Sequence, residues 1–370
     1  MLRQPIKQKR IKWIDIARGI AIIAVVVGHS LGKYFPGKFA NFIFAFHMPI
    51  FFILSGYLYH CQSKRKLFKK TFLNLLVPYI ATVTIELGLL IIYRISKLSI
   101  IAPSQTSSIK LFLISIIYAA GGKVYLPFLH QWLLPVGALW FLVAMFIATQ
   151  LFNLIMSLSF KKYDFLFKTL IIFLLSILGI ESAKYIFLPF SIQPALLSLV
   201  FLWFGYITKR CKLISKFTII PTVICFILWI VDAQFNFFVF ENVSSTYMVL
   251  GIIMGYLSSM VVIKFSILID RLAAKRQGLE HIKQLLVFWG ANSLLILCFH
   301  LIDLNSVQIW PRIVFTSNLD YNVALVMGII YRIIFATLFA LIMPKIPILR
   351  NLYMNRQFPI KNIFGNKKRD

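Results

Sequence analysis

WIDIARGIAIIAVVVGH, residues 13–29, is an apolar stretch long enough to cross most of a bilayer, yet it contains an aspartate, an arginine and a histidine. A helix advances about 100° per residue, so Asp15, Arg18 and His29 lie along one stripe, separated by apolar positions. A charge inside a membrane costs roughly 2.5–3.5 kcal/mol on insertion scales, which makes the stripe a candidate functional surface. The structural alternative is an Asp15–Arg18 pair that anchors the helix end, with His29 at the membrane interface.

The whole chain has the composition of a polytopic membrane protein. Of its 370 residues, 60% are hydrophobic and 14% are charged, whereas about 25% of residues are charged in soluble domains. Lys and Arg total 39 against 11 acidic residues. These cations form short clusters between apolar segments rather than one basic face, which argues against nucleic-acid binding.

Ten apolar runs of about 20 residues, enough to cross the hydrocarbon core, predict an all-α fold of about ten transmembrane helices. An even number of spans places both termini on one side of the membrane. The regions on that side hold 29 Lys and Arg and the opposite regions hold 8, so the positive-inside rule predicts cytoplasmic termini in a multi-pass cell-membrane protein. The runs cover residues 13–32, 42–60, 73–93, 138–158, 169–188, 191–208, 217–235, 246–264, 285–303 and 321–343.

These runs predict one transmembrane domain over residues 1–343 and a basic cytoplasmic tail over 344–370, expected to lie on the anionic inner leaflet. The segment 94–137 holds an apolar run, Ile109–Ala120, that is too short to cross. Treating that run as a span would invert every later loop and remove the charge asymmetry. We therefore expect an external segment with a re-entrant or interfacial helix. The four cysteines show no C-x-x-C spacing, and no metal site, disulfide or bound cofactor is predicted.

Four further segments carry polar residues at membrane depth or at a membrane edge. FHMPIFFILSGYLY, residues 46–59, places His47 before a proline suited to a helix start, although an interfacial helix cap would explain it equally. The basic loop 64–70, which includes Lys69 and Lys70, leads towards Tyr79, and the positive-inside rule alone accounts for its charge.

The other two segments are LWFLVAMF, residues 139–146, and GANSLLILCFH, residues 290–300. Trp140 in the first is of a type that often forms the aromatic belt at a membrane interface. Asn292 and His300 add polarity to the ninth predicted span. Glu86, Glu181 and Arg332 are further candidate buried ionisable groups, for which structural pairs or edge positions are the simpler interpretation.

Taken in this order, the blocks resemble the integral-membrane acyltransferase type 3 family, whose members O-acylate cell-surface sugars. The match extends over essentially the whole chain, and size and basicity are most similar to the polysaccharide or fucose O-acetylase-like members. The matching residues are Asp15, Arg18, Gly19 and His29 of a D-x-x-R-G…H pattern; Phe46, His47, Met48, Pro49, Phe51, Phe52, Ser55, Gly56 and Tyr57 of an FHMP-x-FF-x-x-SGY pattern; Leu139–Leu142; and Asn292–Leu294 with His300.

The chain departs from the family pattern just before the third span. Members often carry two arginines there, in an R-x-x-R-L-x-x-P-Y-like pattern, whereas this chain has Thr71 and Asn74 at the places that align with them. Lys69 and Lys70 are close enough to supply charge. Lysine is a point charge without the bidentate fork of arginine, so donor binding is expected to differ in detail.

The resemblance implies transfer of an acyl group, usually acetyl from acetyl-CoA as co-substrate, to a sugar hydroxyl of a cell-surface or lipid-linked glycan. Arg18, Lys69, Lys70, Tyr79, Trp140, Asn292 and His300 are the expected substrate- and donor-binding residues, and His29, Asp15 and His47 the expected catalytic ones. His29 lies eleven residues beyond Arg18, about 16 Å along the helix. A buried neutral imidazole there can act as general base, or can accept the acyl group covalently.

Two other classes of protein fit the spans. A transporter or export accessory of polysaccharide precursors would also have buried polar residues, but it would predict broken half-helices or an internal repeat. A structural scaffold would have no need of Arg18 and His29. The acceptor glycan and the identity of the acyl group are not readable from the sequence.

Overall fold

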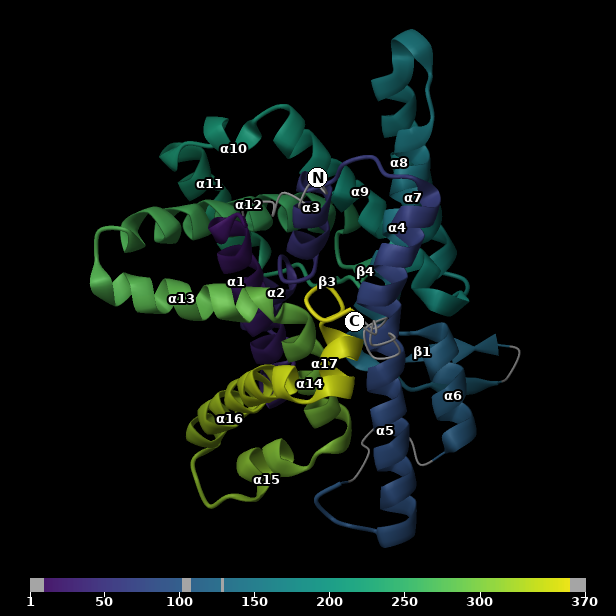
Figure 1. Ribbon diagram of the computed structural model, residues 1–370, viewed down its shortest axis with the longest axis vertical. Coiled ribbons are helices and arrows are strands. Elements are labelled where there is room, and N and C mark those ends of the chain that lie inside the picture. The colour runs from purple at the N-terminus through teal and green to yellow at the C-terminus, as the bar shows by residue number, and fades with distance from the viewer. Residues whose placement is uncertain (1–9, 102–107, 128–129, 360–370) are drawn as a thin grey trace, which may run out of the picture.

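The computed structural model describes residues 10–101, 108–127 and 130–359 of the chain (Figure 1). It is 76% helical, which confirms the all-α class, with two short hairpins that the sequence did not indicate. The first half contains α1 (Lys12–Gly28), α2 (Lys38–Phe44), α3 (Pro49–Tyr57), α4 (Lys64–Thr71), the π-helix η2 (Phe72–Leu76), α5 (Val77–Ser96), α6 (Ile109–Tyr118), β1 (Val124–Leu126), β2 (Gln131–Leu133), α7 (Trp140–Ser157) and α8 (Asp164–Ala183).

The second half continues the helical bundle and ends in a short helix beside the middle of the molecule. Its elements are α9 (Ile192–Arg210), α10 (Leu213–Lys216), α11 (Ile219–Asp232), β3 (Phe238–Val239), β4 (Ser244–Ser245), α12 (Met248–Ala273), α13 (Gln277–Ala291), α14 (Ser293–Ser306), α15 (Ile309–Thr316), α16 (Tyr321–Ile342) and α17 (Pro347–Tyr353). The strands pair antiparallel as β1–β2 and β3–β4.

The expected count of ten full spans is not what the structure has. Among the described residues, seven helices are long and apolar enough to cross a membrane, or eight if the bent pair α13–α14 is one broken span. The expected first and seventh spans are short helices, α1 with 17 residues and α11 with 14, and the ninth bends by 74° between α13 and α14. Hydropathy counts apolar residues whether protein or lipid surrounds them, so it overestimates the span of a helix such as α1 that protein encloses.

Two pairs of glycines let four of these helices cross at backbone contact. A Cβ added to Gly19 would lie 2.2 Å from the Leu286 carbonyl oxygen, and one added to Gly290 would lie 1.8 Å from that of Asp15, so α1 and α13 touch main chain to main chain. Gly56 and Gly205 form the same reciprocal contact between α3 and α9. Small residues permit such close approach within membranes. These crossings hold α1 in the interior of the molecule, where one main apolar core includes residues of α1, α3, α7, α9 and α14.

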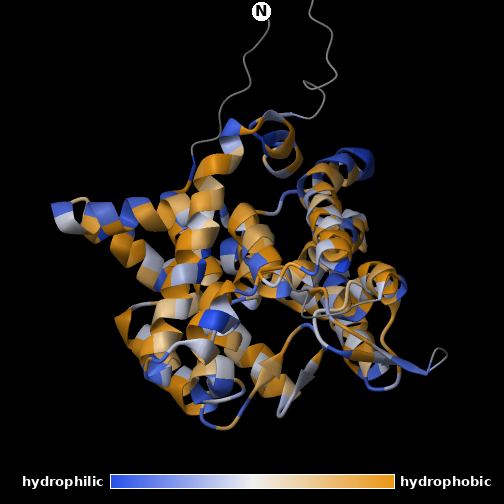
Figure 2. Cartoon of the chain, turned by 90° about the horizontal axis from the view of Figure 1, so that it is seen from below, coloured by the Kyte–Doolittle hydropathy of each residue, from blue (hydrophilic) through white to orange (hydrophobic). Residues whose placement is uncertain are grey.

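Apolar residues predominate along most of the helices, as membrane-spanning helices require (Figure 2). Large apolar side chains on α8, α11 and α16 are exposed, among them Leu174, Ile220 and Ile330. The segment 94–137 contains α6, of ten residues, and the β1–β2 hairpin, and residues 102–107 and 128–129 lie outside the description. At ten residues, α6 is about 15 Å long, too short to cross the hydrocarbon core.

Candidate functional site

The stripe on α1 forms one wall of a cavity of about 1010 Å³. Asp15, Arg18, Ile22 and Val25 all line it, in the order that helical spacing requires. Residues of α3, α4, η2, α7, α9, α13 and α14, of the connection after α3 and of the segment around the end of α17 form the other walls. His29 continues the stripe one turn beyond Val25 and does not itself line the cavity.

One end of the cavity is basic. Its cationic lining residues come from separate segments: Arg10, Arg18, Lys70, Lys209 and Arg356. The alternative interpretation, an Asp15–Arg18 pair, is not what the structure has, because both carboxylate oxygens of buried Asp15 accept hydrogen bonds from Arg10. No described residue makes a hydrogen bond or an ion pair with the guanidinium of Arg18. An arginine that is partly buried without a partner is suited to binding an anion.

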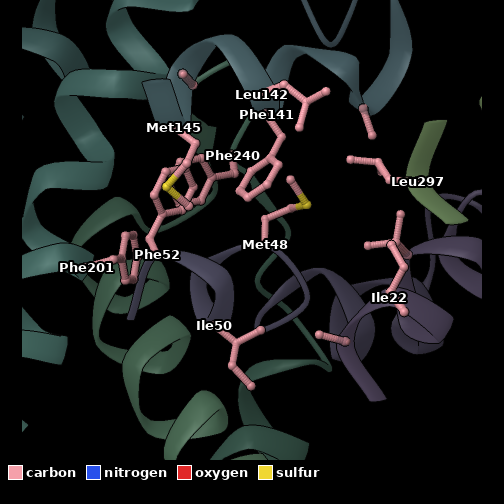
Figure 3. Packing of buried hydrophobic residues seen from close by; sticks show 14 of the residues in the cluster. Ile22, Met48, Ile50, Phe52, Phe141, Leu142, Met145, Phe201, Phe240 and Leu297 are labelled. Carbon is pink, nitrogen blue, oxygen red and sulfur yellow. The ribbon is translucent and has the colours of Figure 1, made fainter. Parts of the chain in front are cut away.

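The middle of the cavity is apolar. Figure 3 shows Ile22 and Leu297 on one side and Met48 and Phe141 on the other, facing the same space. These four side chains belong to four different elements: α1, α14, the turn that precedes α3, and α7. A slot with such walls accommodates an extended, weakly polar chain and excludes a second charged group.

Three histidines lie just past the inner end of the cavity. His29, His47 and His300 are within four residues along the chain of Val25, Met48 and Leu297, which line it. The ring centroids of His29 and His300 are 5.9 Å apart, and Phe44 packs against both His29 and His47, at 6.0 and 4.5 Å. His47 Nδ1 is 3.1 Å from the Ile43 carbonyl oxygen. A carbonyl only accepts, so Nδ1 carries the proton of that bond and a neutral His47 keeps a free acceptor at Nε2.

His300 is fully buried, and neither of its ring nitrogens has a hydrogen-bond partner among the described residues. An unpaired buried donor or acceptor costs about 1–3 kcal/mol. Such a group beside His29 is well placed to bind a polar atom of a substrate or a water molecule.

A buried ion pair fixes the end of α1 at His29. Arg332 on α16 pairs with Asp303 on α14 at 3.0 Å, and both side chains are at most 2% exposed. Arg332 also donates to the backbone carbonyl of His29 at 3.0 Å and to Ser30 Oγ at 3.1 Å, and its guanidinium lies over the Trp310 ring. A hydrogen bond from Tyr331 further satisfies the Asp303 carboxylate. Residues of three helices, α14, α15 and α16, form this network, which fixes the main chain of His29.

Several expected site residues are placed elsewhere. Asp15 is fourteen residues, about 21 Å, from His29, so it does not join the histidines. Tyr79 is buried and donates to the Ile116 carbonyl, and Trp140 packs on Phe240; neither lines the cavity.

Of the two lysines expected to bind the donor, Lys70 lines the cavity and Lys69 does not. Asn292 does line the cavity, at the break between α13 and α14, with its amide hydrogen-bonded to the Phe288 carbonyl. Glu86 is buried and accepts from Asn305, whereas Glu181 forms an exposed pair with Lys184.

Residues of this site that sequence reasoning missed include Asp303, Lys209 and Arg356. Asp303 had a signal, because it is an acid three residues after His300, at the end of an apolar run. An acid there needs a counter-charge, which Arg332 could be expected to supply. Lys209 and Arg356 had none, because each lies in a basic cluster of the kind that the positive-inside rule already explains. No group of His, Cys, Asp and Glu in the described ranges could hold a metal ion.

The sequence matches the family model described as an acyltransferase domain over residues 11–343, which covers every element from α1 to α16. No curated protein and no solved structure matches the chain.

Proposed function

Because this chain belongs to the membrane acyltransferase type 3 family, we propose that it moves an acyl group, in the first instance acetyl, from cytoplasmic acyl-CoA to a hydroxyl of an extracytoplasmic or lipid-linked glycan. The observation that carries this proposal is the single cavity that leads from unpaired cations to within one turn of three clustered histidines. A polyanionic donor with a long, weakly polar arm and a reactive end matches that order of surfaces.

The donor enters at the basic end. Its phosphates bind Arg18 and Lys70 through charge-assisted hydrogen bonds. Such a bond is roughly twice as strong as a neutral one. The pantetheine arm extends along the apolar walls towards His29, about 16 Å further along α1. Met48 lines the cavity and is the chain neighbour of His47, and an unbranched methionine side chain can rotate aside to admit the thioester.

The acceptor hydroxyl reaches His29 from the opposite side. A neutral imidazole nitrogen takes the hydroxyl proton as the oxygen attacks the thioester carbonyl carbon. The tetrahedral intermediate collapses, the carbon–sulfur bond breaks, and the leaving thiolate recovers the proton from the imidazolium. His300 and His47 position the hydroxyl or the carbonyl oxygen, while Arg332 keeps the His29 main chain in place. A covalent acyl-histidine is the alternative route from the same residue.

This reaction places the basic end in the cytoplasm and the histidines near the outer face, which is the orientation that the charge asymmetry of the loops predicts. The test compares surface glycans from cells with and without the gene by mass spectrometry. We expect a glycan species heavier by one acyl group only where the gene is present. Identical glycan masses in both strains, with the protein present in the membrane, would contradict the proposal.

A further inference from the structure

The C-terminal segment 347–359 is a folded part of the molecule, not a free tail. Tyr353 is buried against Phe299, at 5.4 Å between ring centroids, and its hydroxyl is 3.0 Å from that of Thr82 on α5. The Asn351 amide donates to the Pro359 carbonyl, which closes the segment on itself. Residues 360–370 lie outside the described chain, and contact of the basic C-terminal region with the inner leaflet stays a prediction.

This folding places the residues after α17 in the wall of the cavity described above. Tyr353, Met354, Arg356 and Gln357 all line it, at the same end as Arg18. Arg356 is exposed there, and none of the described residues makes a hydrogen bond or ion pair with its guanidinium. The family match ends at residue 343, so this wall belongs to the part of the chain beyond the matched domain.

Charge at this end of the cavity is unbalanced. Asp15 is the only acid among the described lining residues, and Arg10 already pairs with it. Arg356 lies within electrostatic range of Arg10, Arg18 and Lys70. Like charges held together repel each other, so the arrangement is favourable only when an anion with several charges lies between them.

We propose that Arg356 is a phosphate-binding residue of the acyl-donor site. Segment 347–359 forms the part of the cavity wall that positions Arg356 there. This inference rests on the proposed function and extends it by naming a ligand residue and a segment outside the acyltransferase domain. Arg18 on α1 and Arg356 approach the same end of the cavity from opposite ends of the chain. Two planar guanidinium groups fit two phosphate groups of a nucleotide better than a cluster of lysines would.

The test measures acetyl-CoA binding by isothermal titration of the purified full-length protein in detergent, for wild type, Arg356→Gln and Lys345→Gln. Lys345 precedes the same segment, is exposed and does not line the cavity, so it is the matched charge control. Loss of a charged hydrogen bond is worth roughly 1.5–3 kcal/mol, so we expect Arg356→Gln to weaken binding by about 10- to 100-fold and Lys345→Gln by less than about twofold. Arg356→Lys should recover part of the loss.

A second donor separates phosphate binding from a general loss of structure. S-acetylpantetheine carries the thioester arm without any phosphate, so Arg356→Gln should leave its use as an acyl donor unchanged. Equal losses with both donors would overturn the inference and make the segment merely structural. Unchanged acetyl-CoA affinity in Arg356→Gln would overturn the inference alone. Failure of the wild type to bind acetyl-CoA would overturn both the inference and the proposed donor.

Discussion

Arg18 on α1 and Arg332 on α16 are two arginines of apolar helices, and their surroundings differ completely. Arg332 has a complete set of partners: the Asp303 carboxylate, the His29 carbonyl, Ser30 Oγ and the face of Trp310. Arg18 has no hydrogen-bond or ion-pair partner among the described residues and lines the cavity. A charge that the fold has already satisfied supports structure, whereas one left unsatisfied beside a cavity requires a ligand.

The two ends of the α1 stripe therefore have different tasks. At the His29 end, the chain is fixed by a closed network and the remaining polar groups are imidazoles. At the Arg18 end, unpaired cations surround an open space. Under the proposed function, this arrangement separates binding energy from chemistry: the donor phosphates would bind at one end and the reacting carbon would lie at the other.

Removing the imidazole should have the largest effect on activity. We expect His29→Ala to lower acyl transfer by at least a hundredfold, because general bases contribute roughly 10²–10⁴-fold. Acetyl-CoA binding should stay near the wild-type value, since His29 lies beyond the cavity. Glycan acylation and donor titration measure the two quantities in the same preparation. Wild-type levels of acylation in a well-expressed His29→Ala strain would rule out the assignment.

Breaking the closed network should affect stability before chemistry. Asp303→Ala leaves Arg332 buried without its counter-charge, and removing one partner of a buried pair costs about 3–5 kcal/mol. A matched control is Glu181→Ala, which breaks the exposed Glu181–Lys184 pair, worth at most about 1 kcal/mol. We expect the melting temperature in detergent to fall clearly for the first variant and little for the second. Equal melting temperatures would show that Arg332 does not depend on Asp303.

Removing the charge of Arg18 at the other end of the α1 stripe should weaken acetyl-CoA binding without unfolding the protein. Arg18→Gln keeps similar length and removes the charge, so acetyl-CoA should bind about 10- to 100-fold more weakly, at an unchanged melting temperature. Lys69→Gln is the control, because Lys69 is exposed beside the site and does not line the cavity. Normal donor binding together with lost transfer in Arg18→Gln would instead assign Arg18 to the organisation of the catalytic helix.

The sequence predicted the α1 stripe well because helical spacing alone determines which residues share a face, and four of its residues line the cavity. It did not determine which charged groups pair. Asp15 lies three residues from Arg18, yet it pairs with Arg10, since a pairing depends on how the chain enters the helix. The bend after Asn292 and the folding of residues 347–359 depend on contacts between distant segments, such as Gly290 with Asp15 and Tyr353 with Phe299, which no local pattern encodes.

Thiol labelling tests which side of the membrane each end of the α1 stripe faces, and it disturbs neither end. Cys61 and Cys211 are exposed and lie on the side of the Arg18 end, whereas Cys225 and Cys298 are buried. On the proposed orientation, an impermeant thiol reagent applied to intact cells should leave the native protein unlabelled. Lys123→Cys adds an exposed thiol beside the β1–β2 hairpin, within the segment expected to be external, and this variant should be labelled. Permeabilising the cells should then expose Cys61 and Cys211, which serves as the internal control.

Labelling of Cys61 or Cys211 in intact cells, with Lys123→Cys protected, would show that the membrane orientation is the reverse of the proposed one. The unpaired cations would then face outwards, away from any cytoplasmic acyl-CoA, and the proposed direction of transfer would be wrong even if the closed network around His29 were correctly described.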